Sequence, residues 1–228
     1  LESPTIKTKL LKQSKSFGGA ANVAKYSKLL GAEVTFITCM AADSENEFAK
    51  KYNIDVINLD DSVENTKSRF YVLHGDERYK HLQINNTNTE HLNLDIDLDF
   101  DVFDCVAISD YRCGLLNDKL IRRAERSFTK TFGASQVSSH EPNFDSYINM
   151  DYLVCNEHES KFIKKTNNVV ITKGQDGCEL NGIQYPANNV VSPKKLIGAG
   201  DCFYAAFLVF EDLYKANYYA SKYISDEI

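Results

Sequence analysis

Short runs of apolar and β-branched residues recur along the chain, and each is followed by a more polar segment. Val102–Ile108, Tyr152–Cys155 and Val169–Thr172 have the length and composition of buried strands. A helical pattern over Ala20–Leu30 leads into a further strand at Val34–Thr38. This alternation is typical of an α/β fold, with a mainly parallel sheet flanked by helices.

The middle of the chain has a different pattern. Lys67–Leu73 and Tyr79–Ile84 alternate polar with apolar residues across a short polar segment, which predicts an antiparallel hairpin. We expect this insertion, about residues 64–86, to form a small β lid on one edge of a single domain that spans residues 1–228. The N-terminal segment 1–16 is a further candidate for the lid. Cys178–Tyr185, which turns at Asn181-Gly182, predicts a second hairpin.

Composition excludes several classes of protein. With 228 residues, 43% of them hydrophobic, the chain can bury one sizeable core. A net charge of -6 gives no electrostatic surface for nucleic acid. No apolar run approaches the roughly 18 residues of a membrane span. The six cysteines have neither zinc-site nor redox-pair spacing, which favours reduced thiols and a cytoplasmic location.

The segment Gly198-Ala199-Gly200-Asp201 is the strongest candidate for a chemical site, because it opens the apolar helix Cys202–Leu208. Small residues let backbone N–H groups approach an oxyanion, and the positive end of a helix stabilises negative charge on a phosphoryl group. Taken alone, Asp201 is equally explained as an N-terminal cap or a first-turn acid of that helix.

Two more polar clusters follow predicted strands. Thr172–Gly177 places two glycines where a nucleotide could lie against the backbone, and Asn156–Glu159 follows another strand. Open α/β sheets bind ligands at the carboxyl ends of their strands. Glu159 could orient hydrated Mg²⁺, which favours oxygen ligands. Simple helix capping explains Asn156 and Glu159 equally well.

These motifs, in this order, resemble those of the ribokinase-like (PfkB) carbohydrate kinases. The resemblance runs from about residue 14 to about residue 224 and rests on Gly18-Gly19-Ala20-Ala21-Asn22, Asn156-x-x-Glu159, Thr172-x-Gly174-x-x-Gly177 and Gly198-Ala199-Gly200-Asp201. It ends in Ala216–Ala220, which is similar to the family's helix on the adenine side. The resemblance implies a ribokinase-like fold, ATP as phosphoryl donor and Mg²⁺ as cofactor.

The resemblance also implies residue roles. Asp201 would take the proton from the attacking hydroxyl, and the amides of Gly198, Ala199 and Gly200 would form the anion hole. On the ATP side the matching positions are Thr172, Gly174, Gly177 and Asn217, with Asn156 and Glu159 in the magnesium and phosphate shell. On the sugar side the residues implied are Gly18, Gly19, Asn22 and Asp110, and Arg69 or Arg112 could meet a substrate phosphate. Either arginine is equally explained as a solvated surface side chain.

Within the family, Gly18–Ala24, Glu64–Arg69 and Ile108–Tyr111 followed by Gly114 look most like the D-glycero-D-manno-heptose 7-phosphate kinases. The expected reaction is therefore ATP-dependent phosphorylation of a sugar or sugar-phosphate hydroxyl. The alternatives are a ribokinase or nucleoside kinase, and a non-catalytic homologue that binds a sugar or a nucleotide. In this family lid sheets often pack across a two-fold axis, so we also expect a homodimer.

The chain departs from the family pattern in several places. It opens in what resembles the segment after the family's first strand, Asp43 lacks a nearby glycine, and only nine residues separate Glu159 from Val169. Lys195 and Leu196 stand where many relatives have Asp-Thr beside a monovalent cation, so activation by potassium is doubtful. One hypothesis is that the Lys195 ammonium takes the cation's place, and the alternative is that Lys195 faces solvent.

Overall fold

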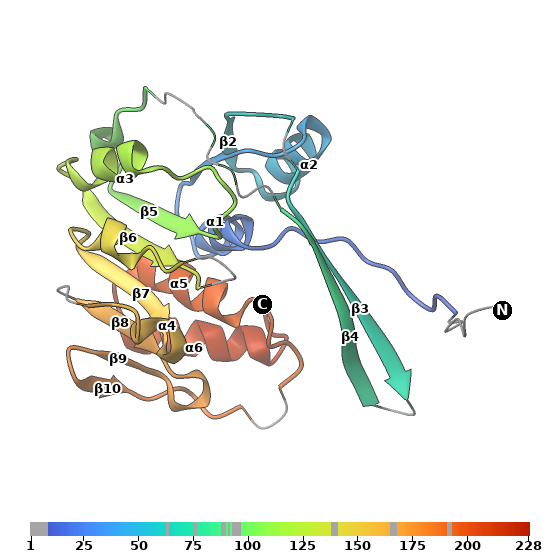
Figure 1. Ribbon diagram of the computed structural model, residues 1–228. Helices are drawn as coiled ribbons and strands as arrows, with labels where there is room; N and C mark the ends of the chain where they lie inside the picture. Colours follow the sequence, from blue (N-terminus) through green and yellow to red (C-terminus); the bar gives the residue numbers. More distant parts are fainter. Residues whose placement is uncertain are drawn as a thin grey trace.

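A six-stranded sheet forms the centre of the molecule in the computed structural model (Figure 1), which describes residues 9–62, 64–74, 77–87, 90, 92, 97–137, 141–164, 168–190 and 193–228. Its strands are β5 (Cys105–Asp110), β6 (Lys130–Ser135), β7 (Tyr152–Asn156), β8 (Val169–Thr172), β9 (Cys178–Leu180) and β10 (Ile183–Tyr185), in the order β10-β9-β8-β7-β6-β5. The strands from β5 to β8 pair in parallel, whereas β9 and β10 are antiparallel. The predicted α/β class with a mainly parallel sheet is confirmed.

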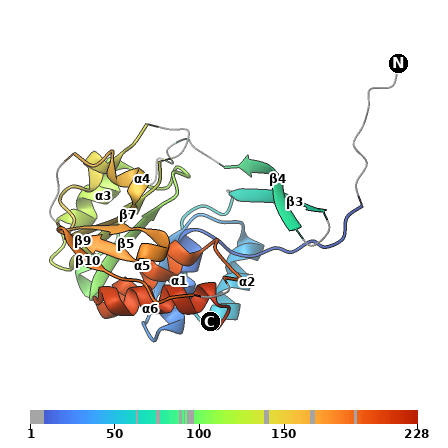
Figure 2. The same cartoon turned by 90° about the horizontal axis from the view of Figure 1, so that it is seen from below.

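Helices cover both faces of this sheet. The helices α1 (Ala20–Leu29), α5 (Ala199–Phe210) and α6 (Leu213–Ile224) lie on one face, and α3 (Asp118–Glu125) and α4 (Glu157–Ser160) lie on the other (Figure 2). Alternation along β7 sends Val154 into the core beneath α5 and α6, while Leu153 and Cys155 enter the core beside α3. The strand is buried on both faces, which is why its sequence is a continuous apolar run.

A second, smaller unit packs beside α1. Strand β1 (Thr35–Thr38) pairs in parallel with β2 (Asp55–Asn58), and α2 (Ala42–Tyr52) connects them. The predicted strand at 34–38 is therefore present, but its described pairing is with β2 and not with the large sheet. Neither α2 nor β2 was predicted, because α2 is strongly charged and only its Ser44 and Phe48 are buried.

The predicted long hairpin is confirmed as β3 (Thr66–His74) and β4 (Glu77–Asn86), which pair in antiparallel fashion. It projects away from the main body, and the chain near the N-terminus runs out on the same side (Figure 1). Residues 9–16 form neither helix nor strand, and residues 1–8 of the predicted lid segment lie outside the described residues. The second predicted hairpin is β9 and β10 at the edge of the large sheet.

Several element boundaries differ from the predicted ones for local reasons. The 3₁₀ turn η1 (Phe100–Val102) precedes β5, so that strand begins three residues later than predicted. Helix α3 begins after Asn117, whose side chain accepts from Leu120 N. Helix α4 is a single turn that ends at Ser160. Among the described helices, none is both long enough and apolar enough to span a bilayer.

Candidate active site

Asp201 lies in the first turn of α5, where three separate segments meet. Tyr111, in the loop after β5, donates its hydroxyl hydrogen to Asp201 Oδ1, and Asn22 Nδ2, from α1, donates to Asp201 Oδ2 at 3.0 Å. Both carboxylate oxygens are thus held by neutral donors. The contact brings Asn22 and Asp201 together, although 179 positions separate them in the sequence.

The environment of Asp201 raises its affinity for a proton. Burial raises the pKa of the carboxyl above the usual aspartate value, while the hydrogen bonds from Tyr111 and Asn22 and the charge of Lys25 act in the opposite direction. A carboxylate that is ionised but more basic than usual is suited to accept a proton from a hydroxyl group. The pKa of Tyr111 is also raised, first by burial and then by Asp201, so its hydroxyl stays protonated and donates.

Two glycines of the site allow close contacts. Gly19 has φ +58°, and a Cβ there would lie 3.2 Å from the Tyr111 ring. Gly198 starts α5 with φ +97°, and a Cβ there would come within 2.7 Å of the Tyr223 hydroxyl. Gly18 and Gly200 border open space, since no atom lies within 4 Å of the position that a Cβ would take.

The three residues predicted to form the anion hole do not have the same surroundings. Ala199 N already donates to Leu196 O at 3.3 Å. Gly200 is exposed at the start of the helix, where backbone N–H groups point outward. The open position for an anion is therefore at Gly200, beside the Asp201 carboxylate.

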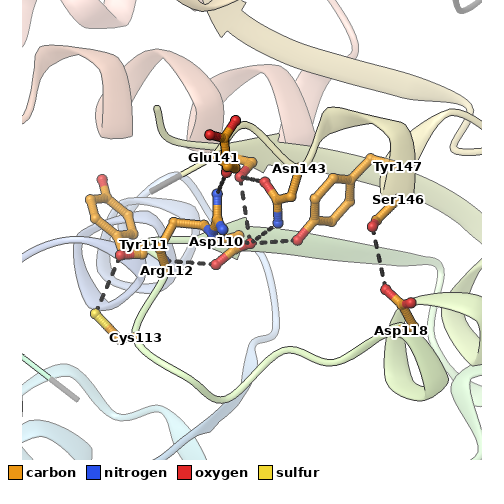
Figure 3. A network of polar contacts seen from close by, with 10 residues as sticks. Asp110, Tyr111, Arg112, Cys113, Asp118, Glu141, Asn143, Ser146 and Tyr147 are labelled. Atoms are coloured by element: carbon orange, nitrogen blue, oxygen red, sulfur yellow. Dashed lines mark hydrogen bonds and ion pairs between the residues drawn. The ribbon is translucent and has the colours of Figure 1, made fainter. Parts of the chain in front are cut away.

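Asp110 is the centre of a separate, buried network beside Tyr111 (Figure 3). Its Oδ2 accepts from the Tyr147 hydroxyl at 2.7 Å and from Asn143 Nδ2 at 2.9 Å, and its Oδ1 accepts from Arg112 N at 2.7 Å. The carboxylate is 6% exposed and its oxygens are already engaged. These contacts hold the loop that carries Tyr111, so Asp110 acts on the site indirectly, by fixing the position of that loop.

The two arginines implied at the sugar side are not brought together. Arg112 donates from Nη1 to Glu141 O at 2.8 Å and has φ +58°, so its side chain helps to close its own loop. Arg69 donates to Gln83 on the exposed hairpin. The hairpin cation that reaches the site is Lys67, whose Nζ lies 5.6 Å from the Tyr111 ring centre.

The predicted magnesium and phosphate residues form a helix cap. Asn156 Oδ1 accepts from Glu159 N, and Glu159 Oε2 accepts from Asn156 N, each at 2.9 Å, which completes a capping box for α4. Burial raises the pKa of Glu159, and the Glu159 charge contributes to the raised pKa of Tyr111. Glu159 is therefore close enough to Tyr111 for its charge to act on the Tyr111 hydroxyl.

The predicted nucleotide residues line the edge of the sheet near β8, where their contacts are with the protein itself. Thr172 Oγ1 donates to Cys155 O at 3.3 Å. Gly174 and Gly177 have positive φ, and a Cβ on Gly177 would lie 2.1 Å from Tyr185 O. The buried Asn217 donates from Nδ2 to Tyr185 O at 2.8 Å and to Pro186 O at 3.2 Å. Asn217 thus fixes the segment after β10 against α6.

An open cavity of about 390 Å³ lies on this side of the sheet. It is lined by Glu157, Ser160, Lys161, Ile171, Lys173 and Glu179. Ile171 and Lys173 flank Thr172 in the sequence, but none of the predicted nucleotide residues lines the cavity.

Comparison with known proteins identifies the family. The model of the pfkB family carbohydrate kinases matches residues 3–167. The chain belongs to this family. The pfkB match covers the α1 motif, the Asp110–Tyr111 loop and the Asn156–Glu159 cap. The predicted resemblance is confirmed, and with it membership of a family of phosphotransferases.

Among curated pfkB-type relatives, the Bifunctional protein HldE of Campylobacter jejuni subsp. doylei is 25% identical over 172 residues. This match covers 74% of the chain but 37% of the relative, so the chain spans little more than a third of that protein's length.

Solved structures with the same fold include a sulfate complex of a pyrophosphate-dependent kinase of the ribokinase family, with a TM-score of 0.67 at 19% identity and coverage of 92% of this chain and 86% of that one. Arabidopsis thaliana ribokinase, complexed with ribose and ATP, gives a TM-score of 0.64 at 15% identity, with coverage of 88% and 77%. Phosphofructokinase-2 from Escherichia coli, in a tetrameric inhibited form, gives 0.63 at 14% identity, with coverage of 96% and 88%. These similarities show that the chain has the ribokinase-like fold.

The chemistry of the site fits the Mg²⁺ ion that the pfkB fold implies. No group of three or more His, Cys, Asp or Glu side chains within the described ranges forms a closed metal site. Glu159 instead provides a carboxylate at the start of α4, the kind of oxygen donor that can hold Mg²⁺ through its bound water. Mg²⁺ that retains most of its water needs few direct protein ligands.

Two residues of the site were missed in the sequence. Tyr111 was noticed only as part of the Ile108–Tyr111 motif, and Lys25 was not noticed. A helical wheel could have found Lys25, because it lies three residues after Asn22 and so on the same face of α1. Lys195, in contrast, forms an ion pair with Asp226. This contact does not favour the hypothesis that the Lys195 ammonium takes the place of a monovalent cation.

Proposed function

We propose that this chain is an ATP-dependent kinase that phosphorylates a hydroxyl of a sugar or sugar phosphate, with Asp201 as the catalytic base. The observation that carries the proposal is the Asp201 carboxylate at the start of α5, held by Asn22 and Tyr111 beside the exposed Gly200. A buried carboxylate of raised pKa can accept the proton of the attacking hydroxyl, and an open helix N-terminus beside it can stabilise the charge of the transferred phosphoryl group.

In the proposed reaction, Asp201 accepts the proton of the acceptor hydroxyl as its oxygen attacks the γ-phosphorus of ATP. The new O–P bond forms as the bond to the ADP oxygen breaks, and the proton ends on Asp201. The amides at Gly198–Gly200 and the positive end of α5 stabilise the charge on the phosphoryl oxygens. Mg²⁺ held near Glu159 would neutralise phosphate charge.

We place the nucleotide along Thr172, Gly174, Gly177 and Asn217, at the turn between β8 and β9. Both glycines have positive φ, where a side chain would be strained, and Asn217 fixes the segment after β10 against α6. Lys173 lines the cavity but is paired with Glu179 at 2.5 Å, so a phosphate would have to compete with that carboxylate.

For the acceptor we propose a heptose 7-phosphate-type sugar, bound near Gly18, Gly19 and Asn22. The match to HldE and the position of Lys67 over Tyr111 support an anionic sugar. Arg69 and Arg112 would have to leave their present partners to reach it. A ribokinase or nucleoside kinase activity, or binding without turnover, remains the alternative.

The test is acceptor-dependent ADP release with Mg²⁺, measured over free sugars, sugar phosphates and nucleosides, with pyrophosphate as a second donor. Asp201→Asn is the matched variant, since it keeps the shape of the side chain and removes the base. Turnover that falls at least ~10³-fold in the variant supports the proposal, as expected when a group acting in the transition state is lost. If wild type and variant are equally inactive with every donor and acceptor while ligands still bind, the non-catalytic alternative is correct.

We also propose that the chain forms one domain with the β3–β4 hairpin as its lid, and that the hairpin mediates a homodimer. Six large apolar side chains of the hairpin are 40–54% exposed: Phe70, Val72, Leu73, Tyr79, Leu82 and Ile84. A two-stranded hairpin alone is marginally stable in water, so a partner that covers these side chains would stabilise it.

A further inference from the structure

Lys25 is a half-buried cation beside the catalytic base, on the same helix face as Asn22. Its Nζ donates to Asn22 Oδ1 at 3.1 Å and lies 3.9 Å from the centre of the Tyr26 ring. Among the residues that the structure describes, no carboxylate is close enough to Lys25 Nζ for an ion pair. A partly buried ammonium without such a partner is costly for stability, which calls for another reason for its presence.

The contact with Lys25 determines which way the Asn22 amide faces. An ammonium group can only donate hydrogen bonds, so it selects the amide oxygen of Asn22. The amide nitrogen then faces Asp201 Oδ2, to which it donates at 3.0 Å. If the amide were turned over, its oxygen would face the carboxylate, and two acceptors would repel each other at that distance.

We propose that Lys25 is a positioning residue for the base: its ammonium orients the Asn22 amide toward Asp201, and its charge keeps the Asp201 carboxylate ionised. The catalytic consequence rests on the proposed role of Asp201, but the electrostatic one does not.

Charged groups on the neighbouring elements also act on Lys25 and Asp201. Burial lowers the pKa of Lys25, Asp201 and Cys202 from α5 raise it, and Lys195 and Lys51 lower it. On the other side of Asp201, Tyr111 donates a hydrogen bond to the carboxylate, and the charge of Glu159 acts on the Tyr111 hydroxyl. Lys25 is the cation among the groups that hold the pKa of Asp201 down.

The direct test is the titration of Asp201 in Lys25→Met, a change that keeps the length of the side chain and removes its charge and donor. The protein is labelled at aspartate ¹³Cγ, and the Asp201 resonance is assigned by its loss in Asp201→Asn. We expect the pKa of Asp201 to rise by about one unit in Lys25→Met, the low end of the effect of a nearby charge. Lys25→Arg, which keeps charge and donors, should restore most of the wild-type value.

The control is Lys28→Met on the same helix, since Lys28 pairs with the exposed Glu33 at 2.8 Å. This variant should leave the titration of Asp201 unchanged. If Lys25→Met does not yield folded protein, Lys25→Gln, which removes the charge and keeps a polar side chain, carries the same expectation. An unchanged pKa of Asp201 in a folded, uncharged Lys25 variant overturns the proposal.

Turnover gives a second readout that separates this inference from the proposed function. The acidic limb of the kcat profile should move to higher pH by the same amount in Lys25→Met, so that kcat measured well below the pKa of Asp201 falls about tenfold. A fall in kcat without movement of the limb or of the NMR titration overturns the inference. If wild type lacks kinase activity, the proposed function fails, and the NMR titration still decides the role of Lys25.

Discussion

Tyr111 is the side chain that joins the separate parts of the candidate site. Its hydroxyl donates to Asp201, its ring lies against Gly19, and the Lys67 ammonium lies over that ring. Its loop is held by the buried Asp110 network. Tyr111 therefore connects the proposed catalytic base with the Gly18–Gly19 turn, which is proposed to bind the sugar, and with the hairpin.

Tyr111→Phe should keep the packing on Gly19 and remove only the donor to Asp201. Hydrogen bonds to charged groups contribute about 1.5–3 kcal/mol, so kcat should fall about ten- to hundredfold. Loss of the donor also raises the pKa of Asp201, which shifts the acidic limb of the kcat profile to higher pH. Steady-state kinetics across pH measure both effects, with Tyr152→Phe, at the start of β7, as the control. A variant with wild-type kcat and pH profile would show that the Asn22 contact alone is sufficient.

Asp201 also affects the stability of the fold. Burial raises its pKa in the folded protein above the unfolded value, so the ionised carboxylate destabilises the fold at neutral pH. Asp201→Asn should therefore increase the free energy of unfolding at pH 7, by on the order of 1 kcal/mol. The advantage should shrink as pH falls through the pKa of folded Asp201, because the wild-type carboxyl is then protonated. Below the unfolded pKa the stability contribution of the protonated group is fully present.

Urea unfolding of both proteins at a series of pH values measures this difference, and the comparison cancels titration of the other groups. An advantage of Asp201→Asn that grows on acidification would contradict the sign. A more stable but inactive Asp201→Asn variant would mean that the buried, ionised carboxylate of Asp201 serves function at a cost in stability.

At the scale of elements, the turn between β8 and β9 is the most tightly constrained part of the predicted nucleotide side. Gly177 has φ +91°, and any Cβ there would overlap the backbone at Tyr185 and Ala187. Gly174 also has positive φ, but no atom lies within 4 Å of the position of its Cβ. The two glycines of one motif therefore differ in what they tolerate.

Gly177→Ala should destabilise the protein by about 2–4 kcal/mol, since strain at positive φ adds to overpacking against backbone atoms. Gly174→Ala, which suffers the φ penalty alone, should cost about 1 kcal/mol. Urea unfolding gives both values, and nucleotide affinity should fall more in the Gly177 variant. Equal destabilisation by the two substitutions would mean that the Tyr185–Ala187 segment can move away.

At the scale of the molecule, the strands and the catalytic segment were predictable where burial on two faces or glycine motifs left a strong pattern. β5, β7 and β8 are apolar runs, and α5 begins at Ala199, within the Gly198–Gly200 motif. β6 was missed because its sequence, Lys130–Ser135, includes a small residue where Gly133 makes room for Met150. The partners of Asp201 could not be read from one segment, since they lie 90 and 179 positions away in the chain.

One face of the β3–β4 hairpin exposes apolar side chains to solvent. Pairing places Phe70 opposite Leu82 and Val72 opposite Tyr79, and alternation along β3 puts these pairs on one face. The Arg69–Gln83 pair lies on the other face. The first face is thus the more apolar one, whereas the face of Arg69 and Gln83, although more polar, also carries Tyr71 and Leu73. The more apolar face is the one expected to pack against a partner.

The double variant Phe70→Ser/Leu82→Ser should convert a dimer into a monomer, because it removes the central apolar pair of this face. Sedimentation equilibrium measures the mass, and Gln83→Ser, on the polar face, should remain dimeric. Dimerisation also has a consequence for the site, since Lys67 at the base of β3 lies over Tyr111. If a covered hairpin holds Lys67 in place, the monomeric variant should have a raised KM for anionic acceptors with little change for neutral ones. A double variant that remains dimeric would mean that the subunits meet through another surface.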